Sequence, residues 1–241
     1  MAFASVGTLG KVSDTSAGTS IVLTTAAAAE AGNIVIVVVA KDNVSTTDGN
    51  TNEITSVTDS ATGNTWTKAR EFCNGQGAAN AGATVAVYYS RITNQIALGG
   101  TITANFSDSR TASAISAWEF SGNAISVDGT PVDLANDAAG PGSMALAGLT
   151  NASHIFFRGI AVEVGAMVGL TPTVGYTAIE FVSGGVGAAG MGCDGEFIIA
   201  TATGHTSAPS GDTGDQAAVF IGFIESGSGP LSGSHLLLKG V

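Results

Sequence analysis

The sequence predicts an all-β fold, a single antiparallel β-sandwich of two sheets with long loops rich in Gly, Ala and Asn. Three observations predict it. Short segments rich in β-branched residues recur along the chain, separated by Gly, Asn, Asp and Ser, as expected for strands joined by turns. Residues 34–40 form an unbroken apolar run, which is typical of a strand buried on both faces. Residues 101–106 alternate apolar side chains with Thr and Asn, which is typical of a strand with one buried face.

The composition provides for a substantial core and argues against some partners. Hydrophobic residues make up 44% of the 241 residues and charged residues 11%, which argues against intrinsic disorder. The net charge is −11, and the eight Lys and Arg residues are scattered along the chain. Binding to phosphates needs a basic patch, so we expect no nucleic acid partner.

The run at residues 34–40 is the predicted central strand. It holds six β-branched residues, from Ile34 to Val39, followed by Ala40. Turn residues flank it on both sides, and a helix of seven residues would be unusually short. The run is also far shorter than the ~20 apolar residues that cross a bilayer, and we expect no membrane association.

The first half of the chain is predicted to hold further strands around this centre. They lie at residues 6–11, 20–24, 54–58, 65–72, 84–92, 101–106 and 111–120. The alanine-rich run at 26–30 is too short to hold a helix by propensity alone, so it is interpreted as a connection. Residues 41–52 are predicted to form a polar loop, and residues 73–82 an exposed connection.

The second half repeats this pattern. A polar stretch at 121–142 contains a short β-branched segment at 127–132, and further strands are predicted at 144–149, 155–164, 176–182, 196–203 and 217–224. The last of these resembles the central strand in being apolar throughout, so we expect it to be buried on both faces.

No shift in composition marks a domain boundary, so residues 1–225 are predicted to form one β-sandwich domain. Residues 226–241 are predicted to form a Gly/Ser-rich arm with an apolar end. The residues Leu236, Leu237 and Leu238 at that end are the predicted interaction site of the arm, which we expect to dock on a neighbouring molecule.

Two cysteines and the N-terminus bear on the cellular compartment. Cys73 and Cys193 are far apart in sequence and could pair, but a domain of this size does not need a disulfide, which favours free thiols. The segment after Met1 has neither the basic region nor the apolar core of a signal peptide, so we expect synthesis and folding in a cytoplasm.

One loop offers possible metal ligands. Asp48, Asn50 and Asn52 alternate in a spacing that can wrap a calcium ion, but Glu53 occupies the position where the full calcium loop has glycine. A solvated turn capped by its own side chains is favoured. The acidic loop with Asp212 and Asp215 is interpreted in the same way, and no cofactor is expected.

Other candidates for chemistry are weak. The histidines His154, His205 and His235 lack the spacing of metal ligands, although His205 lies near the acidic loop. No G-x-S-x-G motif is present. We expect no enzymatic activity.

Two further residue groups have a functional and a structural interpretation. The glutamates Glu119, Glu163 and Glu180 interrupt apolar strands and could supply paired carboxylates, but we expect them to face solvent. The aromatic residues could form a sugar-stacking platform, although aromatics in strands more often pack in the core. These residues are Trp66, Tyr88, Tyr89 and Trp118.

Several segments together resemble a β-sandwich module found in bacteriophage virion proteins and bacterial surface proteins. The segments are the run at 34–40 after Gly-Asn, V-T-D-S at 57–60 leading into G-N-T-W at 63–66, V-Y-Y at 87–89, I-T-A-N-F-S at 102–107 and A-W-E-F-S-G at 117–122. The resemblance covers residues 20–225, with Thr62 as a small insertion within a turn. It implies a jelly-roll-like sandwich and transfers no catalytic residues.

The resemblance implies two possible functions. A surface protein would need export, whereas a phage structural protein assembled in the host cytoplasm needs no signal peptide. The leading expectation is a non-enzymatic virion component, a capsid decoration or cement protein that stabilises the shell through protein contacts. Its expected partners are the major capsid protein or other virion proteins, together with copies of itself. The alternative is a carbohydrate-binding host-recognition module of a tail or fibre.

Overall fold

The protein is all-β in the computed structural model, which describes residues 3–137, 140–163, 169–185, 190–211 and 213–226. Within these ranges the chain forms sixteen strands and no helix, so the prediction of an all-β fold is confirmed. The strands are β1 (Ala4–Asp14), β2 (Gly18–Thr24), β3 (Ile34–Asp42), β4 (Ile54–Asp59), β5 (Thr67–Cys73), β6 (Ala83–Arg91), β7 (Thr101–Arg110), β8 (Ser113–Ser121), β9 (Ile125–Asp137), β10 (Met144–Leu146), β11 (Ala152–Glu163), β12 (Thr177–Ala178), β13 (Val182–Gly184), β14 (Met191–Ala202), β15 (His205–Ser207) and β16 (Asp215–Glu225).

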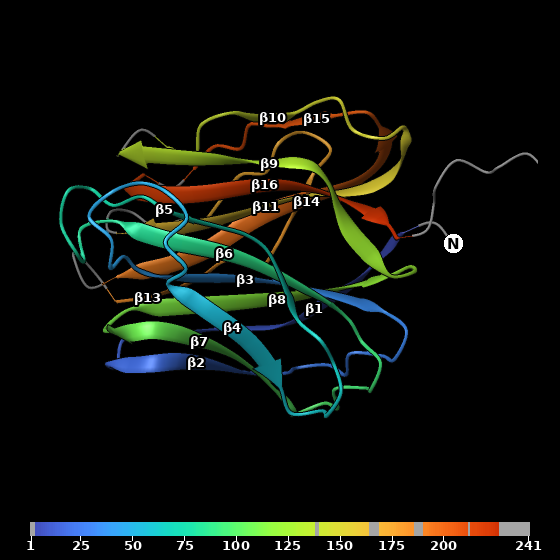
Figure 1. Cartoon of the computed structure of the whole chain (residues 1–241), viewed down its shortest axis with the longest axis horizontal. Coiled ribbons are helices and arrows are strands. Elements are labelled where there is room, and N and C mark those ends of the chain that lie inside the picture. Colours follow the sequence, from blue (N-terminus) through green and yellow to red (C-terminus); the bar gives the residue numbers. More distant parts are fainter. Residues whose placement is uncertain (1–2, 138–139, 164–168, 186–189, 212, 227–241) are drawn as a thin grey trace, which may run out of the picture.

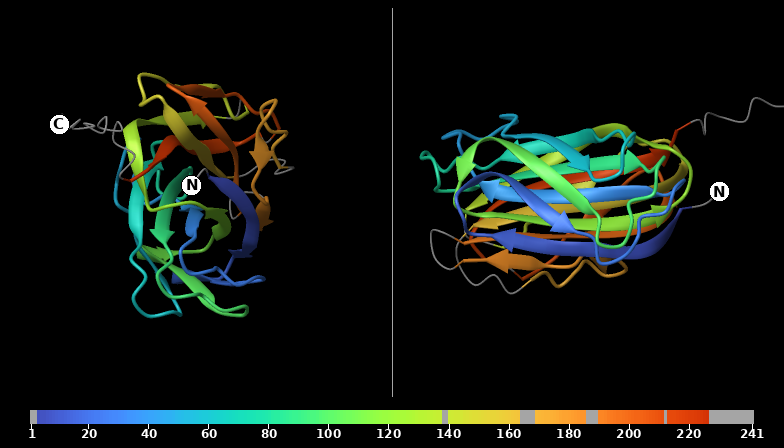
Figure 2. Two further views of the ribbon diagram at one scale, coloured as in Figure 1. Left: turned by 90° about the vertical axis from the view of Figure 1, so that its right-hand side faces the viewer. Right: turned by 90° about the horizontal axis from the view of Figure 1, so that it is seen from below.

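The strands form four antiparallel sheets that stack as layers (Figure 1). Two large sheets lie in the middle, one of five strands in the order β1-β8-β3-β6-β5 and one of six in the order β12-β14-β11-β16-β9, with β13 also paired to β14. The sheet β2-β7-β4 covers the outer face of the first, and the short pair β10-β15 covers the outer face of the second. Figure 2 shows this stack from its end and from below. The structure thus adds two small layers to the two sheets predicted.

Strand β3 lies at the centre of the five-stranded sheet and is buried on both faces, as predicted. The even-numbered residues from Ile34 to Ala40 face the six-stranded sheet, and the odd-numbered residues from Val35 to Val39 face the three-stranded sheet. All seven are fully buried. Burial of one such side chain contributes ~1.5–3 kcal/mol. Because its two faces lie in different cores, β3 stabilises both.

Strand β16 has the same role in the six-stranded sheet. Its odd-numbered residues from Ala217 to Phe223 face the five-stranded sheet, and Phe220 faces the β10-β15 pair. The prediction that this strand is buried on both faces is confirmed. The two central sheets approach closely at Gly159 of β11, where an added Cβ would lie 2.8 Å from a methyl group of Val87.

Every long edge strand pairs irregularly with its neighbour. Register shifts occur in the pairings of β1, β2, β4, β5 and β9. The extra residues lie in the edge strand itself in four of these pairings, whereas at β2 they lie in its partner β7. The pairings of β3 with β6 and β8, and of β11 with β14 and β16, run without a register shift. The remaining edges, β10, β12, β13 and β15, are two or three residues long. Bulged or very short edge strands are poor templates for pairing with another chain.

Some boundaries differ from those predicted. Residues 121–142, interpreted as a polar stretch with a short strand, contain the thirteen-residue strand β9. This strand lies at a sheet edge and is half-buried, so it carries many polar residues. The segment at 176–182 divides into the short strands β12 and β13, and β15 had not been predicted.

The two cysteines do not form a disulfide. Cys73 and Cys193 are both buried free thiols, which confirms the favoured interpretation. Cys193 lies in the core between the two central sheets, where its Sγ is 3.5 Å from the carbonyl oxygen of Val38. Burial raises the pKa of the Cys193 thiol well above its usual value.

Candidate functional site

A groove of about 540 Å³ opens where the edge strand β4 of the three-stranded sheet lies beside β5 and β6 of the five-stranded sheet. Its volume is within the range of ~300–1,000 Å³ that is usual for ligand sites. Its walls come from β4, β5, β6 and the loop that precedes β4. The lining residues are Asn50, Asn52, Thr55, Ser56, Val57, Trp66, Lys68 and Tyr88.

Two aromatic rings with fixed orientation line the groove. The Nε1 of Trp66 donates a hydrogen bond to Asp59 Oδ2 over 2.7 Å. The hydroxyl of Tyr88 donates to the carbonyl oxygen of Ile54 over 2.7 Å. Tyr88 is only 3% exposed, and burial raises its pKa far above the usual value. Trp66 is half-buried, so it retains surface that a ligand can contact.

Lys68 is the only charged residue in the described lining of the groove. Its Nζ donates to Asn52 Oδ1 over 2.7 Å and to Glu71 Oε2 over 2.6 Å. The same atom lies 5.6 Å from the centre of the Tyr88 ring, within cation–π range. Because Glu71 balances its charge, Lys68 contributes a hydrogen-bond donor to the groove but little net field.

Amides and hydroxyls form the rim. Asn50, Asn52 and Thr55 are exposed, and Ser56 is partly exposed. Asn52 has a left-handed backbone with φ of 54°, a conformation that asparagine adopts more readily than most residues. The groove therefore offers neutral groups that both donate and accept hydrogen bonds.

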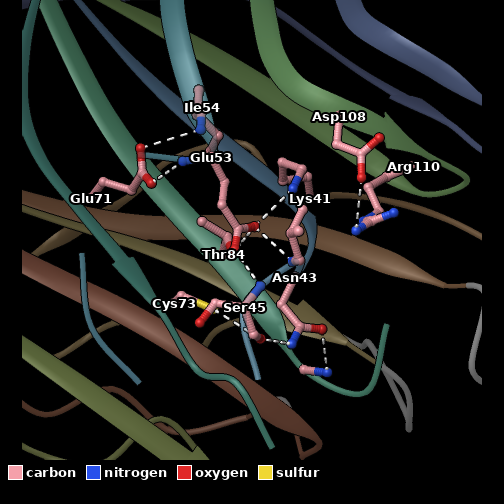
Figure 3. A network of polar contacts seen from close by, with 12 residues as sticks. Lys41, Asn43, Ser45, Glu53, Ile54, Glu71, Cys73, Thr84, Asp108 and Arg110 are labelled. Atoms are coloured by element: carbon pink, nitrogen blue, oxygen red, sulfur yellow. Dashed lines mark hydrogen bonds and ion pairs between the residues drawn. The ribbon is translucent and has the colours of Figure 1, made fainter. Parts of the chain in front are cut away.

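A buried ion pair lies behind the groove (Figure 3). Lys41 Nζ contacts Glu53 Oε2 over 2.8 Å, and both side chains are almost completely buried. The Glu53 carboxylate also accepts hydrogen bonds from the backbone N–H groups of Val44 and Ser45 and from the hydroxyl of Thr84. These contacts hold the loop at 43–53 against the five-stranded sheet.

The two members of this pair have shifted pKa values. Burial lowers the pKa of Lys41, and the hydrogen bond and charge of Glu53 only partly offset that effect. For Glu53 burial favours the protonated form, but Lys41 and the backbone donors outweigh it and hold the pKa of this carboxyl below its usual value. These contacts therefore favour the ionised form of the Glu53 carboxylate.

Glu71 joins this ion pair to the groove. Its carboxylate accepts the backbone N–H of Glu53 over 2.5 Å and that of Ile54 over 3.3 Å, and Figure 3 shows both contacts. Its other strong contact is Lys68, which lines the groove. Lys68 is thus joined through the Glu71 carboxylate to the backbone of Glu53, and the side chain of Glu53 pairs with Lys41. Sequence reasoning missed this connection, because a lysine after an apolar run ordinarily marks the exposed end of a strand.

The predicted calcium ligands have other contacts in the structure. Asp48 Oδ1 accepts a hydrogen bond from the backbone N–H of Gly75 over 3.0 Å, and Asn52 Oδ1 accepts one from Lys68 Nζ. Asn50 lines the groove beside Asn52, whereas Glu53 points into the ion pair. In the described ranges no three His, Cys, Asp or Glu side chains are grouped so that they could hold a metal ion.

The four strand aromatics do not share one surface. Trp66 and Tyr88 lie on the side of the three-stranded sheet, whereas Tyr89 and Trp118 pack into the core between the two central sheets. The Tyr89 ring contacts Phe223 at a centroid distance of 5.3 Å. The four aromatics therefore do not form a single platform, and only Trp66 and Tyr88 line the groove.

Two of the three glutamates are buried, contrary to expectation. Glu119 is 2% exposed and accepts hydrogen bonds from the backbone of Glu30 and the amide of Asn33, which fixes the turn before β3. Glu163 is 1% exposed, and no hydrogen-bond partner for its Oε2 exists in the described chain. Glu180 is half-buried and accepts the hydroxyl of Thr8.

The histidines take structural contacts. His154 is fully buried and lies 2.9 Å from Asp128 Oδ2. His205 Nδ1 is 2.7 Å from the Tyr176 hydroxyl. His235 lies outside the described residues.

The structure also does not describe the other predicted contact residues. Asp212 and the predicted arm residues Leu236, Leu237 and Leu238 lie outside the described residues.

A second buried cation was also missed by sequence reasoning. Arg158 in β11 is fully buried and donates to the carbonyl oxygens of Pro141 and Gly142 and to the hydroxyl of Ser207. That hydroxyl donates to Glu196 over 2.6 Å, so a relay joins cation and carboxylate. Burial lowers the pKa of Arg158 to about 10, with Glu196 opposing the shift. This network fixes the loops that cover the six-stranded sheet.

Comparisons with known proteins give no relative from which a function could be inferred, so the groove and the scaffold are the basis for the proposals below. Among the described residues, no helix has the length and apolar character needed to span a membrane. No protein-family model, no curated protein sequence and no solved structure matches the chain.

Proposed function

We propose that the chain is a non-enzymatic structural protein of a bacteriophage virion, a decoration or cement protein that binds the assembled capsid shell. The proposal starts from the sequence resemblance to virion β-sandwich modules. The same resemblance leads us to interpret the two central sheets as a jelly-roll-like sandwich. Its partners would be the major capsid protein or other virion proteins and further copies of the chain, assembled in the host cytoplasm.

The observation that supports this function best is that the edge strands of the sheets are either irregularly paired or very short. All five long edge strands pair with a register shift, and the other edges are two or three residues long. A protein that must occupy defined positions on a shell benefits from edges that do not pair with one another in solution. Contacts to the shell would then use loops, sheet faces or the C-terminal arm.

The test is addition of the purified full chain to shells of the encoding phage from which the protein is absent. We expect saturable binding at a fixed number of copies per shell, measured by co-sedimentation and by electron microscopy of the particles. A chain that ignores shells, or that appears only on tails in native particles, would overturn the decoration function.

The second candidate function is carbohydrate recognition in a tail or fibre. The groove beside Trp66 and Tyr88 favours it, because the rings are fixed and the rim is made of amides and hydroxyls. Immunogold labelling of particles separates the two candidates, since a decoration protein labels heads and a recognition module labels tails.

A further inference from the structure

We propose that the groove between β4, β5 and β6 binds an uncharged oligosaccharide, with the Trp66 ring as the stacking surface and the Asn50 and Asn52 amides as hydrogen-bonding partners. This inference rests on the second candidate function, carbohydrate recognition, and adds the site and the class of ligand.

The aromatic part of the groove is rigid before any ligand arrives. The hydrogen bond from Trp66 Nε1 to Asp59 fixes the indole, and the bond from Tyr88 to the Ile54 carbonyl fixes the phenol. The C–H groups of a pyranose ring carry partial positive charge and pack favourably on the negative face of an aromatic ring. A ring already held in place loses little conformational entropy when the sugar binds.

The polar part of the groove matches sugar hydroxyls. A sugar hydroxyl both donates and accepts a hydrogen bond, and so does the amide of Asn50. The Ser56 hydroxyl accepts from the Asn105 amide and can still donate, whereas the Thr55 hydroxyl donates to the Asn105 carbonyl and can still accept. The Asn52 side-chain oxygen already accepts a hydrogen bond from Lys68. That bond fixes the orientation of the amide and leaves its NH₂ group able to donate to a ligand. A few polar groups converging beside an apolar surface are the usual composition of a small-ligand site.

The charge balance favours a neutral ligand over an acidic one. Recognition of carboxylate or phosphate ordinarily uses arginine or several cations. The described lining of the groove has the single cation Lys68, and Glu71 pairs with it at 2.6 Å. The net charge of −11 adds a field that repels anions.

The wall of the groove is held from behind. Glu71 accepts the backbone N–H groups of Glu53 and Ile54, which directly follow Asn52, and Glu53 is paired with Lys41. The segment bearing Asn50 and Asn52 is thus bonded to the five-stranded sheet through buried groups. Such support is what keeps a binding site in its productive geometry.

The test titrates the purified full chain with neutral maltotetraose, cellotetraose and chitotetraose, and with acidic trigalacturonate and sialyllactose. The chain has two tryptophans, Trp66 and Trp118, so the Trp118→Phe variant leaves Trp66 as the only indole reporter. We expect at least one neutral probe to bind, to change the emission of Trp66 in that variant, and to exceed the acidic probes in affinity. Calorimetry provides the dissociation constants.

Two variants locate the site. Trp66→Ala should weaken binding about tenfold or more, the loss expected when an aromatic contact of ~1.4 kcal/mol is removed. Asn50→Ala changes an exposed side chain, so it should fold normally and weaken binding several-fold. Trp118→Phe is the matched control and should bind as the parent does.

Each result decides the proposal. Binding of a neutral probe that both groove variants weaken supports it. Tighter binding of the acidic probes overturns the class of ligand, and binding that is unchanged in both variants overturns the site. Absence of saccharide binding in a chain that saturates phage shells overturns the inference while the decoration function stands.

Discussion

Two buried carboxyl groups show how differently similar burial can act in one molecule. Glu53, behind the groove, is 3% exposed, and Glu163, at the end of β11, is 1% exposed. Lys41 lies 2.8 Å from Glu53 and holds its pKa below the usual value despite burial. Burial, then the negative charges of Asp42 and Asp215, raise the pKa of Glu163 to about 8. A cation within hydrogen-bond distance therefore decides which protonation state is buried.

The contrast predicts opposite roles for the two charges. Glu53 is a buried anion that fixes a loop, and it must stay ionised for Lys41 to remain paired. Glu163 is an acid that the folded state keeps protonated at neutral pH, because burial raises its pKa to about 8. Removal of the charge of Glu53 should therefore lower the stability of the fold, whereas removal of the ionisable group of Glu163 should raise it at high pH.

The largest expected effect is that of Glu53→Gln. This change leaves Lys41 as a buried cation without a carboxylate, and loss of one partner of a buried pair typically costs about 3–5 kcal/mol. Urea denaturation at pH 7 should show that loss in the free energy of unfolding. The exposed Glu30 provides the matched control, and Glu30→Gln should change stability by less than about 0.5 kcal/mol. Equal effects of the two changes would contradict the structural role of the pair.

The second prediction concerns Glu163→Gln. The unfolded chain ionises this carboxyl near its ordinary pKa of 4.5, whereas the folded chain keeps it protonated up to about pH 8. The stability that this group contributes is therefore complete below pH 4.5 and is lost as pH rises toward 8, by at most about 1.4 kcal/mol per pH unit. The glutamine variant, which mimics the protonated acid, should lack that fall.

Urea denaturation of the parent and of Glu163→Gln at pH 5, 6, 7 and 8 measures this difference. The variant should gain on the parent as pH rises and be the more stable protein at pH 8. Parallel curves across this range would show that Glu163 does not titrate as proposed.

A smaller effect is expected for Thr84→Val. The Thr84 hydroxyl donates to Glu53 Oε2 over 2.9 Å, and valine keeps the shape without the donor. Because Glu53 retains Lys41 and two backbone donors, the loss should be about 1.5–3 kcal/mol, as for one hydrogen bond to a charged group. A loss as large as that of Glu53→Gln would mean that the hydroxyl, not the cation, holds the carboxylate.

The smallest effect is kinetic and uses the two thiols. Burial raises the pKa of Cys73 to about 11, and Cys193 is also fully buried, so neither should react with a thiol reagent in the native parent. Cys73 lies beside the loop that Glu53 fixes, with its Sγ 3.9 Å from the Ser45 carbonyl. In Glu53→Gln, Cys73 should therefore be labelled before Cys193 at low urea. Simultaneous labelling would show that the loop opens only when the whole protein unfolds.

The positions of most strands along the chain could be predicted from the sequence, but few of the buried polar contacts could. The run from Ile34 to Ala40 is apolar at every position, which identifies a strand with two buried faces whatever covers them. The same pattern cannot name the covering sheets, so the three-stranded and two-stranded layers were not foreseen. The groove escaped prediction because Trp66, just before β5, and Tyr88, in β6, meet only where β4 lies beside β5 and β6.

The sequence by itself determined that this chain is an all-β protein with a central strand at 34–40, which the structure extends to Asp42. It favoured free cysteines, and the structure has both thiols free. The period of two in apolar residues is a local property, and it is readable without the fold. The tertiary structure decided which polar residues are buried and what they contact. Lys41, Glu53 and Glu163 look like ordinary strand-end or loop residues in the sequence, and only packing between layers removes them from water and sets their charges.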